Sequence, residues 1–91
     1  MTYIDVMWLY DLSDEPYRLV SELDADNFDT RKLEFFLSGD VGIAASAISI
    51  GTTMLGIVAL PEIDEINADD EFQCKAITKQ EFEELWLKYA V

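Results

Sequence analysis

The sequence contains no histidine, one cysteine and only six lysine and arginine residues in 91 positions. Without histidine, the chain lacks the commonest general base, the partner of a catalytic serine and the commonest transition-metal ligand, which excludes hydrolase triads and histidine zinc sites. A lone Cys74 cannot form a disulfide within the chain, which favours a reducing compartment, and the first residues show no secretory signal. The sequence therefore predicts a cytoplasmic protein that is not an enzyme and needs neither a metal nor another cofactor.

Basic residues are too few and too scattered to form a phosphate-binding patch. Against them stand nineteen aspartate and glutamate residues, which give a formal net charge of −13. A surface of this potential repels nucleic acid and anionic lipid and attracts basic proteins at salt-dependent rates. We therefore expect a basic protein partner, no direct binding of nucleic acid and no membrane association.

Motifs for metal binding or catalysis are incomplete. Asp24, Asp26 and Asp29 begin like a calcium loop, but the sixth position is not glycine and the twelfth is Phe35. The four glycines match neither a phosphate-binding loop nor the dinucleotide fingerprint. Cys74 has no histidine to activate it, and its apolar neighbourhood predicts a small core residue.

Charge is missing altogether between Asp40 and Glu62, a stretch long enough to span a membrane as a helix. Glycines, serines and threonines interrupt the stretch, and acids flank it, which favours buried strands. A membrane span stays the alternative, because small residues are tolerated in spanning helices.

Apolar residues make up 51% of the chain, enough for the core of one domain over residues 1–91. Alternation of apolar and polar side chains predicts strands over 3–11, 17–24 and 31–38 and from Val41 onward, with a turn at 38–40. Ile57–Leu60 is a candidate edge strand.

Two helices are predicted after this meander of strands. Pro61 suits the first position of a short helix through Ile66, and a further short strand is expected over Phe72–Ile77. Thr78 and Glu81 form a capping box before apolar residues at helical spacing. The predicted fold is α+β: an antiparallel meander sheet of about four to six strands, with the short helix and a C-terminal amphipathic helix packed on it.

A first candidate binding surface follows if the C-terminal helix covers the face with Ile4, Tyr17, Leu33 and Val41. The reverse face would then carry apolar anchors inside an acidic ring, a composition suited to a protein interface. Alternatively, the short helix or the segment near Ile57 covers that face, or two copies dimerise through it. The residues of this surface are Asp5, Met7, Leu9, Val20, Glu22, Asp24, Asp26, Glu34 and Phe36.

A second candidate surface is the acidic segment around the short helix, for which a solvated turn is the alternative. Its residues are Glu62, Asp64, Glu65, Asp69, Asp70 and Glu71.

Several segments resemble an uncharacterised family of small bacterial domains, and the similarity spans nearly the whole chain. The matching segments are Trp8–Tyr10, Asp14–Pro16, Arg31–Phe36, Leu55–Gly56, Pro61–Asn67 and Phe82–Trp86. Members of this family occur near polymorphic toxin genes, so the resemblance implies an immunity role and no established chemistry. Members often have histidine where Tyr10 stands.

The leading hypothesis is an immunity- or antitoxin-like inhibitor that occludes a basic toxin, one acting on nucleic acid, without catalysis. The alternatives are a phage-encoded inhibitor that mimics nucleic acid to block a host defence complex such as CRISPR, and a homodimeric structural domain.

Overall fold

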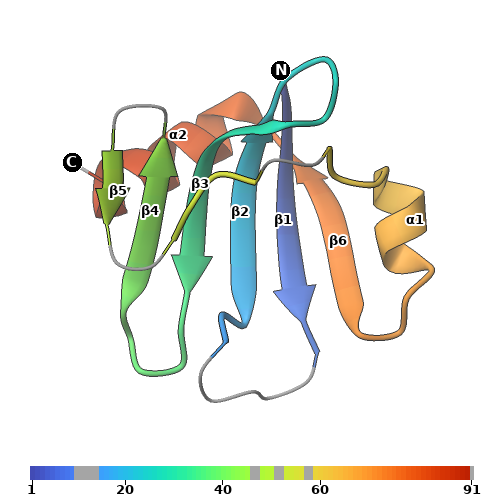
Figure 1. The fold of residues 1–91 in the computed structure, drawn as a ribbon, viewed down its shortest axis with the longest axis horizontal. Helices are drawn as coiled ribbons and strands as arrows, with labels where there is room; N and C mark the ends of the chain where they lie inside the picture. The colour runs from blue at the N-terminus through green and yellow to red at the C-terminus, as the bar shows by residue number, and fades with distance from the viewer. Residues whose placement is uncertain (10–14, 46–47, 51–52, 57–58, 91) are drawn as a thin grey trace.

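The computed structural model describes residues 1–9, 15–45, 48–50, 53–56 and 59–90 (Figure 1). They form a six-stranded sheet of antiparallel pairs in the order β5-β4-β3-β2-β1-β6. Two helices, α1 (Ile63–Asn67) and α2 (Lys79–Tyr89), pack on it, which confirms the predicted α+β fold. The strands are β1 (Thr2–Trp8), β2 (Arg18–Leu23), β3 (Asp29–Phe35), β4 (Val41–Ala45), β5 (Ile48–Ile50) and β6 (Phe72–Ile77).

The predicted meander is confirmed for β1 to β4, and the turn before β4 has Gly39 at a φ of 96°, a conformation that favours glycine. The first strand ends at Trp8 rather than at residue 11, and residues 10–14 lie outside the described part. Of the candidate edge strand at 57–60, residues 57 and 58 are also outside it, and Ala59 and Leu60 are not in a strand.

The short helix begins later than predicted. Glu62 is the N-cap of α1 and Ile63 its first residue, so Pro61 lies before the helix. The predicted strand over Phe72–Ile77 is confirmed as β6, which pairs with β1 and forms the opposite edge of the sheet from β5.

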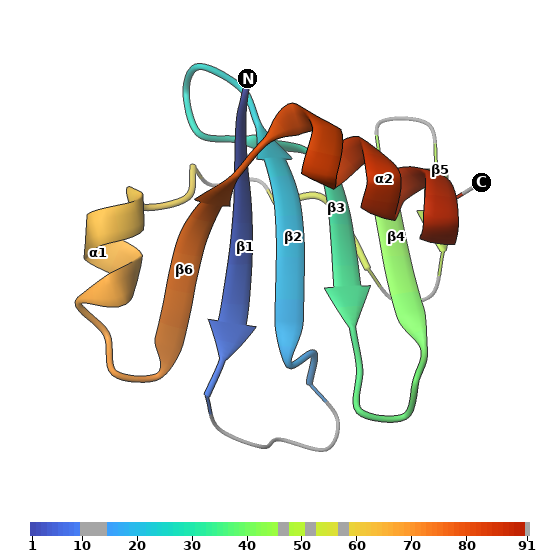
Figure 2. The same ribbon diagram turned by 180° about the vertical axis from the view of Figure 1, so that it is seen from behind.

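The C-terminal helix α2 crosses one face of the sheet (Figure 2). Its predicted capping box is present: the Glu81 backbone N–H donates to Thr78 Oγ1 at 3.1 Å, and the Thr78 backbone N–H donates to Glu81 Oε1 at 3.2 Å. Phe82 is fully buried between helix and sheet. The buried residues of this cluster are Tyr3, Val20, Leu33, Phe35, Ile43 and Phe82.

The opposite face is covered by α1 and by residues 53–56 and 59–62, which run in front of the sheet in Figure 1. Several hydrogen bonds hold this segment. Thr53 Oγ1 donates to Glu34 Oε1 at 2.6 Å, the Gly56 N–H donates to Asp29 Oδ1 at 3.0 Å, and the Leu60 N–H donates to the carbonyl of residue 27 at 2.8 Å. The buried residues beneath this cover are Ile4, Val6, Leu23 and Cys74.

The assumed partition of side chains between the faces is wrong for five positions, Ile4, Asp5, Met7, Val20 and Glu22. Ile4 lies under α1, whereas Tyr3 faces α2, because Tyr3 pairs with Glu22 and Ile4 with Ser21. Val20 pairs with Leu33 and therefore shares the α2 face. Tyr17 packs on the α2 side, but it precedes β2 and does not follow the alternation of that strand.

Arg31 connects α2 to the sheet through hydrogen bonds, an ion pair and ring contacts. Its guanidinium donates to Glu22 through Nε at 2.9 Å and Nη2 at 2.7 Å, and it forms an ion pair with Glu83 of α2. It also lies over the rings of Phe82 and Trp86, at 4.8 and 5.1 Å from their centroids. Glu22 is 7% exposed, so this carboxylate is buried with its charge compensated.

The stability of the fold is expected to depend on Glu22 in acid. Hydrogen bonds from Arg31 lower the pKa of Glu22 from 4.5 to about 2, so its stabilising effect is complete above pH 4.5 and is lost as the pH falls towards 2. The full linkage value is about 3 kcal/mol. Screening by nearby solvent reduces the expected loss to about 2 kcal/mol, measurable by urea unfolding at a series of pH values.

The Glu22→Gln variant is the control, because it cannot titrate at this position. Its free energy of unfolding should fall less steeply across the same pH range. Equal slopes in the variant and the parent chain would contradict the assignment to Glu22.

No helix among the described residues has the length and apolar character needed to cross a membrane. The charge-free stretch after Asp40 instead contributes β4 and β5.

Candidate protein-binding surface

The first predicted surface does not lie together on one face. Val20 is fully buried beneath α2, and Asp5 and Glu22 are 5% and 7% exposed on that same side of the sheet. Asp5 accepts hydrogen bonds from Arg18, and Glu22 from Arg31. These two carboxylates hold the fold together and are not placed to form an acidic ring around Val20.

The remaining residues of that surface are spread over several parts of the fold. Met7, 37% exposed, is on the α2 side of β1, and Leu9 follows this strand at 54% exposed. Glu34 is on the opposite side, where Thr53 binds it, so the covering segment that the sequence left as an alternative is present there. Phe36, half-buried, follows β3.

Asp24 and Asp26 lie in the turn between β2 and β3. The Asp24 carboxylate accepts the backbone N–H groups of Asp26 at 2.9 Å and Phe28 at 3.1 Å. An aspartate that binds its own turn in this way is a common turn-forming arrangement. The aspartates that resemble a calcium loop therefore include one whose Oδ1 is engaged in shaping the chain.

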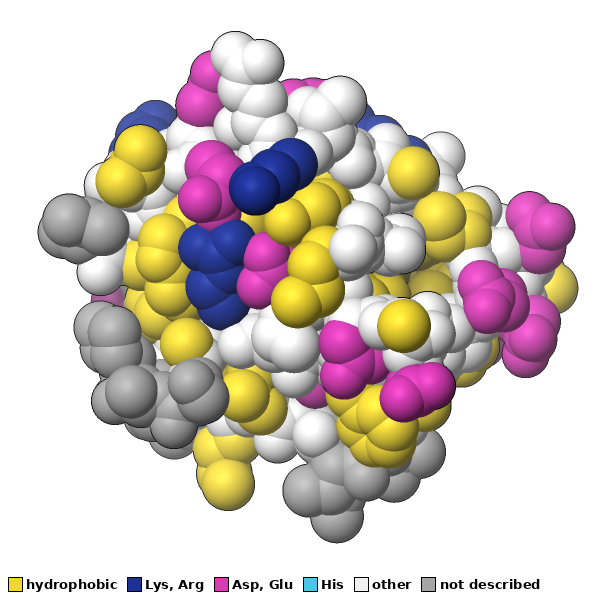
Figure 3. All heavy atoms as spheres, turned by 90° about the horizontal axis from the view of Figure 1, so that it is seen from above, with side chains coloured by type: hydrophobic (Ala, Val, Ile, Leu, Met, Phe, Trp, Pro, Cys, Tyr) yellow, Lys and Arg dark blue, Asp and Glu magenta, His cyan; other side chains and the backbone are white. Residues whose placement is uncertain are grey.

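The second predicted surface is brought together by the structure. Glu62 to Glu71 form α1 and the turn that leads into β6, and all six acids of this segment are exposed. We call these acids, with the apolar residues Leu60, Pro61, Ile66 and Phe72, the α1 surface. In Figure 3, the acidic side chains over α1 have no lysine or arginine beside them.

Asn67 fixes the position of α1 on the sheet. Its side-chain Nδ2 donates to the Cys74 carbonyl at 2.8 Å, and its Oδ1 accepts the Cys74 N–H at 2.6 Å. The amide side chain thus satisfies backbone groups on the edge strand β6, which would otherwise be open to pairing with another strand. Cys74 is 6% exposed, as predicted for a core residue, and burial raises the pKa of its thiol.

An apolar hollow of about 270 Å³ lies between α1 and β6. Leu60, Ile63, Ile66 and Phe72 pack against the buried cluster on this side. The acids of this region were predicted from the sequence, but its apolar part was not. The spacing of Ile63 and Ile66 and the position of Pro61 were the available signals. The hollow is lined by Leu60, Pro61, Glu65, Ile66, Asp69 and Phe72.

Charge on the α1 surface is not compensated nearby. The segment from Glu62 to Glu71 contains no lysine or arginine, and within the described residues none of its carboxylates takes part in an ion pair. Asp69 accepts the Glu71 N–H at 2.9 Å, and Glu62 accepts a hydrogen bond from Asn27 at 2.9 Å. The arrangement is an apolar hollow with an uncompensated acidic rim.

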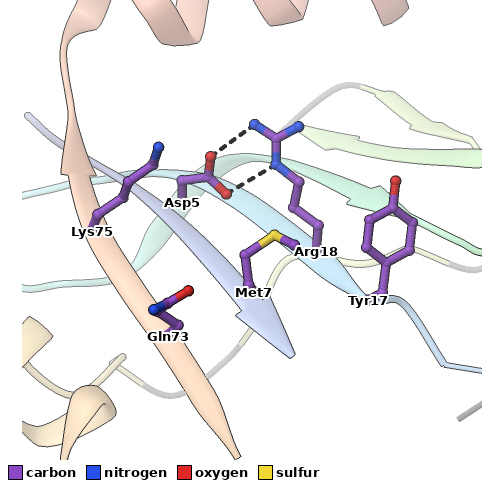
Figure 4. Close-up of a pocket in the computed structure, with 6 residues that line it drawn as sticks. All are labelled: Asp5, Met7, Tyr17, Arg18, Gln73 and Lys75. Atoms are coloured by element: carbon purple, nitrogen blue, oxygen red, sulfur yellow. Dashed lines mark hydrogen bonds and ion pairs between the residues drawn. The ribbon is translucent and has the colours of Figure 1, made fainter. Parts of the chain in front are cut away.

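A second hollow, of about 550 Å³, lies on the side of the sheet that carries α2 (Figure 4). We call its lining the open sheet face: Asp5, Met7, Tyr17, Arg18, Gln73 and Lys75. Arg18 donates to both carboxylate oxygens of Asp5, at 3.0 and 2.7 Å, and these hydrogen bonds raise the pKa of Arg18. Neither Arg18 nor Lys75 was singled out from the sequence.

Basic residues gather on one side of the molecule, although the sequence indicated that they were scattered. Lys32 lies on the opposite side and pairs with Asp29 at 3.6 Å. The others belong to strand positions facing α2 or to α2 itself: Arg18, Arg31, Lys75, Lys79 and Lys88.

The described residues include no group of three or more acidic or cysteine side chains arranged to hold a metal ion. The described elements and the acids around α1 define a small α+β domain with a strongly acidic end. The chain belongs to the family described as "Domain of unknown function (DUF6881)", whose model matches residues 2–91. No curated protein and no solved structure matches the chain.

Proposed function

We propose that this chain is a non-catalytic binding protein that occludes a basic protein partner through the α1 surface. The observation that carries the proposal is the apolar hollow bounded by Leu60, Ile66 and Phe72 within a rim of exposed carboxylates that form no ion pair among the described residues. An apolar side chain of the partner would fill the hollow, and lysine or arginine residues around it would meet the rim. Apolar anchors supply most of the affinity of such interfaces, and complementary charge supplies rate and selectivity.

The biological role that fits this partner is that of a bacterial immunity protein or antitoxin. A toxin that acts on nucleic acid needs a basic surface to bind phosphate, and that surface is what an acidic protein covers. A net charge of −13 gives long-range attraction to such a toxin and repels its nucleic-acid substrate. Inhibition of this kind requires complementary surfaces and no turnover.

Reversing charge on the rim should slow association with the partner. The Glu65→Lys/Asp69→Lys variant is expected to lower the association rate constant about tenfold at low salt and to flatten its dependence on salt. The partner is isolated with the parent chain, identified and produced in pure form, and the rates are measured by stopped-flow fluorescence or biosensor kinetics.

The Glu15→Lys/Asp40→Lys variant is the matched control, because it reverses two exposed acids elsewhere and changes net charge equally. It should slow association by less than about threefold. Equal effects of the two variants, or a partner without a basic surface, would overturn the proposed interface.

The inhibitory role has its own test: the partner expressed alone should stop growth, and co-expression with the parent chain should restore it. A partner that is harmless when expressed alone would reject the immunity role and leave the binding surface standing.

A further inference from the structure

The apolar hollow between α1 and β6 adjoins another hollow, of about 410 Å³, at the turn that leads from α1 into β6. We call it the turn hollow. Asp69 and Phe72 line both hollows, so the two share a wall. In Figure 1, this turn lies at the end of the sheet where β1 finishes. The other described residues of the turn hollow include Leu9, Asp70 and Gln73.

Contacts within the fold hold the shared wall in place. The Phe72 ring lies 5.4 Å from the Trp8 ring, centroid to centroid, and the Phe72 N–H donates to the Asp69 carbonyl at 3.1 Å. The Leu9 N–H donates to the Glu71 carbonyl at 2.8 Å, which joins the residue after β1 to the turn. A binding surface that is already ordered loses little conformational entropy when a partner binds.

The two hollows suit different side chains. Four of the six residues around the apolar hollow are apolar, so a fully apolar side chain fits there. The turn hollow combines Leu9, 54% exposed, with the carboxylates of Asp69 and Asp70. Lysine and arginine have an apolar stem and a charged end, so their side chains match this combination. Among the described residues, no lysine or arginine lines either hollow.

The polar groups of the turn hollow are not equally available to a cation. Both polar atoms of the Asn67 side chain are already bonded to the backbone of Cys74. Asp69 uses Oδ1 to accept the Glu71 N–H. Asp70 is exposed, and within the described part of the chain it takes part in no ion pair. A cation would therefore be bound by Asp70 and by the second carboxylate oxygen of Asp69.

We propose that the apolar hollow and the turn hollow together bind an extended segment of the partner protein that carries an apolar residue and, two positions along, a lysine or arginine. Side chains two positions apart lie on the same face of an extended segment, so they can enter two hollows that share a wall. The apolar side chain would occupy the apolar hollow, and the basic side chain would lie over Leu9 with its charge at Asp70. This inference rests on the proposed function and adds the sequence pattern that the partner must carry.

The test uses the peptide acetyl-Thr-Leu-Thr-Arg-Thr-amide, in which threonine favours an extended backbone, titrated into the isotopically labelled chain and followed by NMR. The peptide should shift the backbone amide signals of Ile66 in the apolar hollow and of Leu9 and Asp70 in the turn hollow, with millimolar affinity. Replacing leucine with alanine in the peptide should weaken binding about tenfold, because less apolar surface is buried. Replacing arginine with glutamine should weaken it about threefold, the size expected for an exposed ion pair.

Asp70→Asn should weaken binding of the arginine peptide about threefold and leave binding of the glutamine peptide unchanged. Asp64→Asn is the matched control, because it neutralises an exposed acid of the same segment that lines neither hollow. It should weaken binding of the arginine peptide by less than about 1.5-fold. Both side chains are exposed, so both variants should keep the parent spectrum elsewhere.

Any of three results would overturn this inference: no shifts at Leu9 and Asp70, equal weakening by the two variants, or binding of acetyl-arginine amide at these residues as tight as that of the peptide. The last result would mean a general cation site. None of the three would reject the proposed interface, which is tested separately by the effect of Glu65→Lys/Asp69→Lys on association with the partner.

Discussion

Replacing Phe82 with alanine is expected to lower the free energy of unfolding by about 3 to 5 kcal/mol. The Phe82 ring is fully buried and lies 5.2 Å from the Tyr3 ring and 6.0 Å from the Trp86 ring, centroid to centroid. It also lies under the Arg31 guanidinium, so its removal empties the contact between α2 and the sheet. Because a small domain has a total stability of about 5 to 15 kcal/mol, the loss is a large part of the whole.

The loss is measured by urea unfolding followed by tryptophan fluorescence and circular dichroism. Leu87→Ala is the control on the same helix, since Leu87 is 65% exposed and its truncation should change stability by less than about 0.5 kcal/mol. If the alanine variant does not fold at all, Phe82→Leu keeps the test quantitative with a smaller expected loss. Equal stability of the Phe82→Ala and Leu87→Ala variants would show that α2 is not docked through Phe82.

Local patterns were enough to predict most of the elements. Strand β1 was predicted from the alternation of apolar and polar residues in its sequence and α2 from its capping box, and both signals depend only on residues close in sequence. The start of α1 was predicted two residues too early, because proline before a helix is compatible with several nearby start positions. Strand β5 could not be delimited from its charge-free sequence.

The assignment of strand faces could not be obtained in the same way. Alternation within one strand does not say which of its two faces matches a given face of the next strand. In β1, Ile4 and Val6 lie on one face and Tyr3 on the other, and all three are buried, so hydrophobicity did not distinguish the faces. The pairing of Tyr3 with Glu22 decides the question, and it also places Val20 in the core.

The candidate surfaces also differ in how much of each could be predicted from residues close in sequence. The acids from Glu62 to Glu71 are neighbours in sequence, so their proximity was predictable. The hollow beside them depends on how α1 packs against β6, and it joins Leu60 to Phe72 across that contact. The open sheet face depends on register, because Asp5, Arg18 and Lys75 come from three different strands.

Replacing Arg31 with methionine is expected to cost about 3 to 5 kcal/mol of unfolding free energy. Methionine keeps much of the side-chain volume but leaves the Glu22 carboxylate, 7% exposed, without its main hydrogen-bond donor. The ion pair with Glu83 and the contacts with the Phe82 and Trp86 rings are lost as well. The measurement is urea unfolding at neutral pH, with Lys79→Met as the control for loss of an exposed charge.

Arg31→Met can destabilise the fold in two ways, by leaving the Glu22 charge unpaired or by removing the contacts of Arg31 with the aromatic rings, and a double variant with Glu22→Met distinguishes them. If Arg31→Met destabilises the fold mainly by leaving the Glu22 carboxylate buried and unpaired, adding Glu22→Met should recover stability. The free energy of unfolding of the double variant should then exceed that of the single variant by about 1 to 3 kcal/mol. If Arg31 acts chiefly through its contacts with Phe82 and Trp86, the double variant should be no more stable than the single one.

The pH dependence of stability also distinguishes the two causes. An unpaired Glu22 favours its protonated form, so the Arg31→Met variant should lose less stability than the parent as the pH falls below 4.5. A variant that loses stability in acid as steeply as the parent would mean that Arg31 does not hold Glu22 in its charged form.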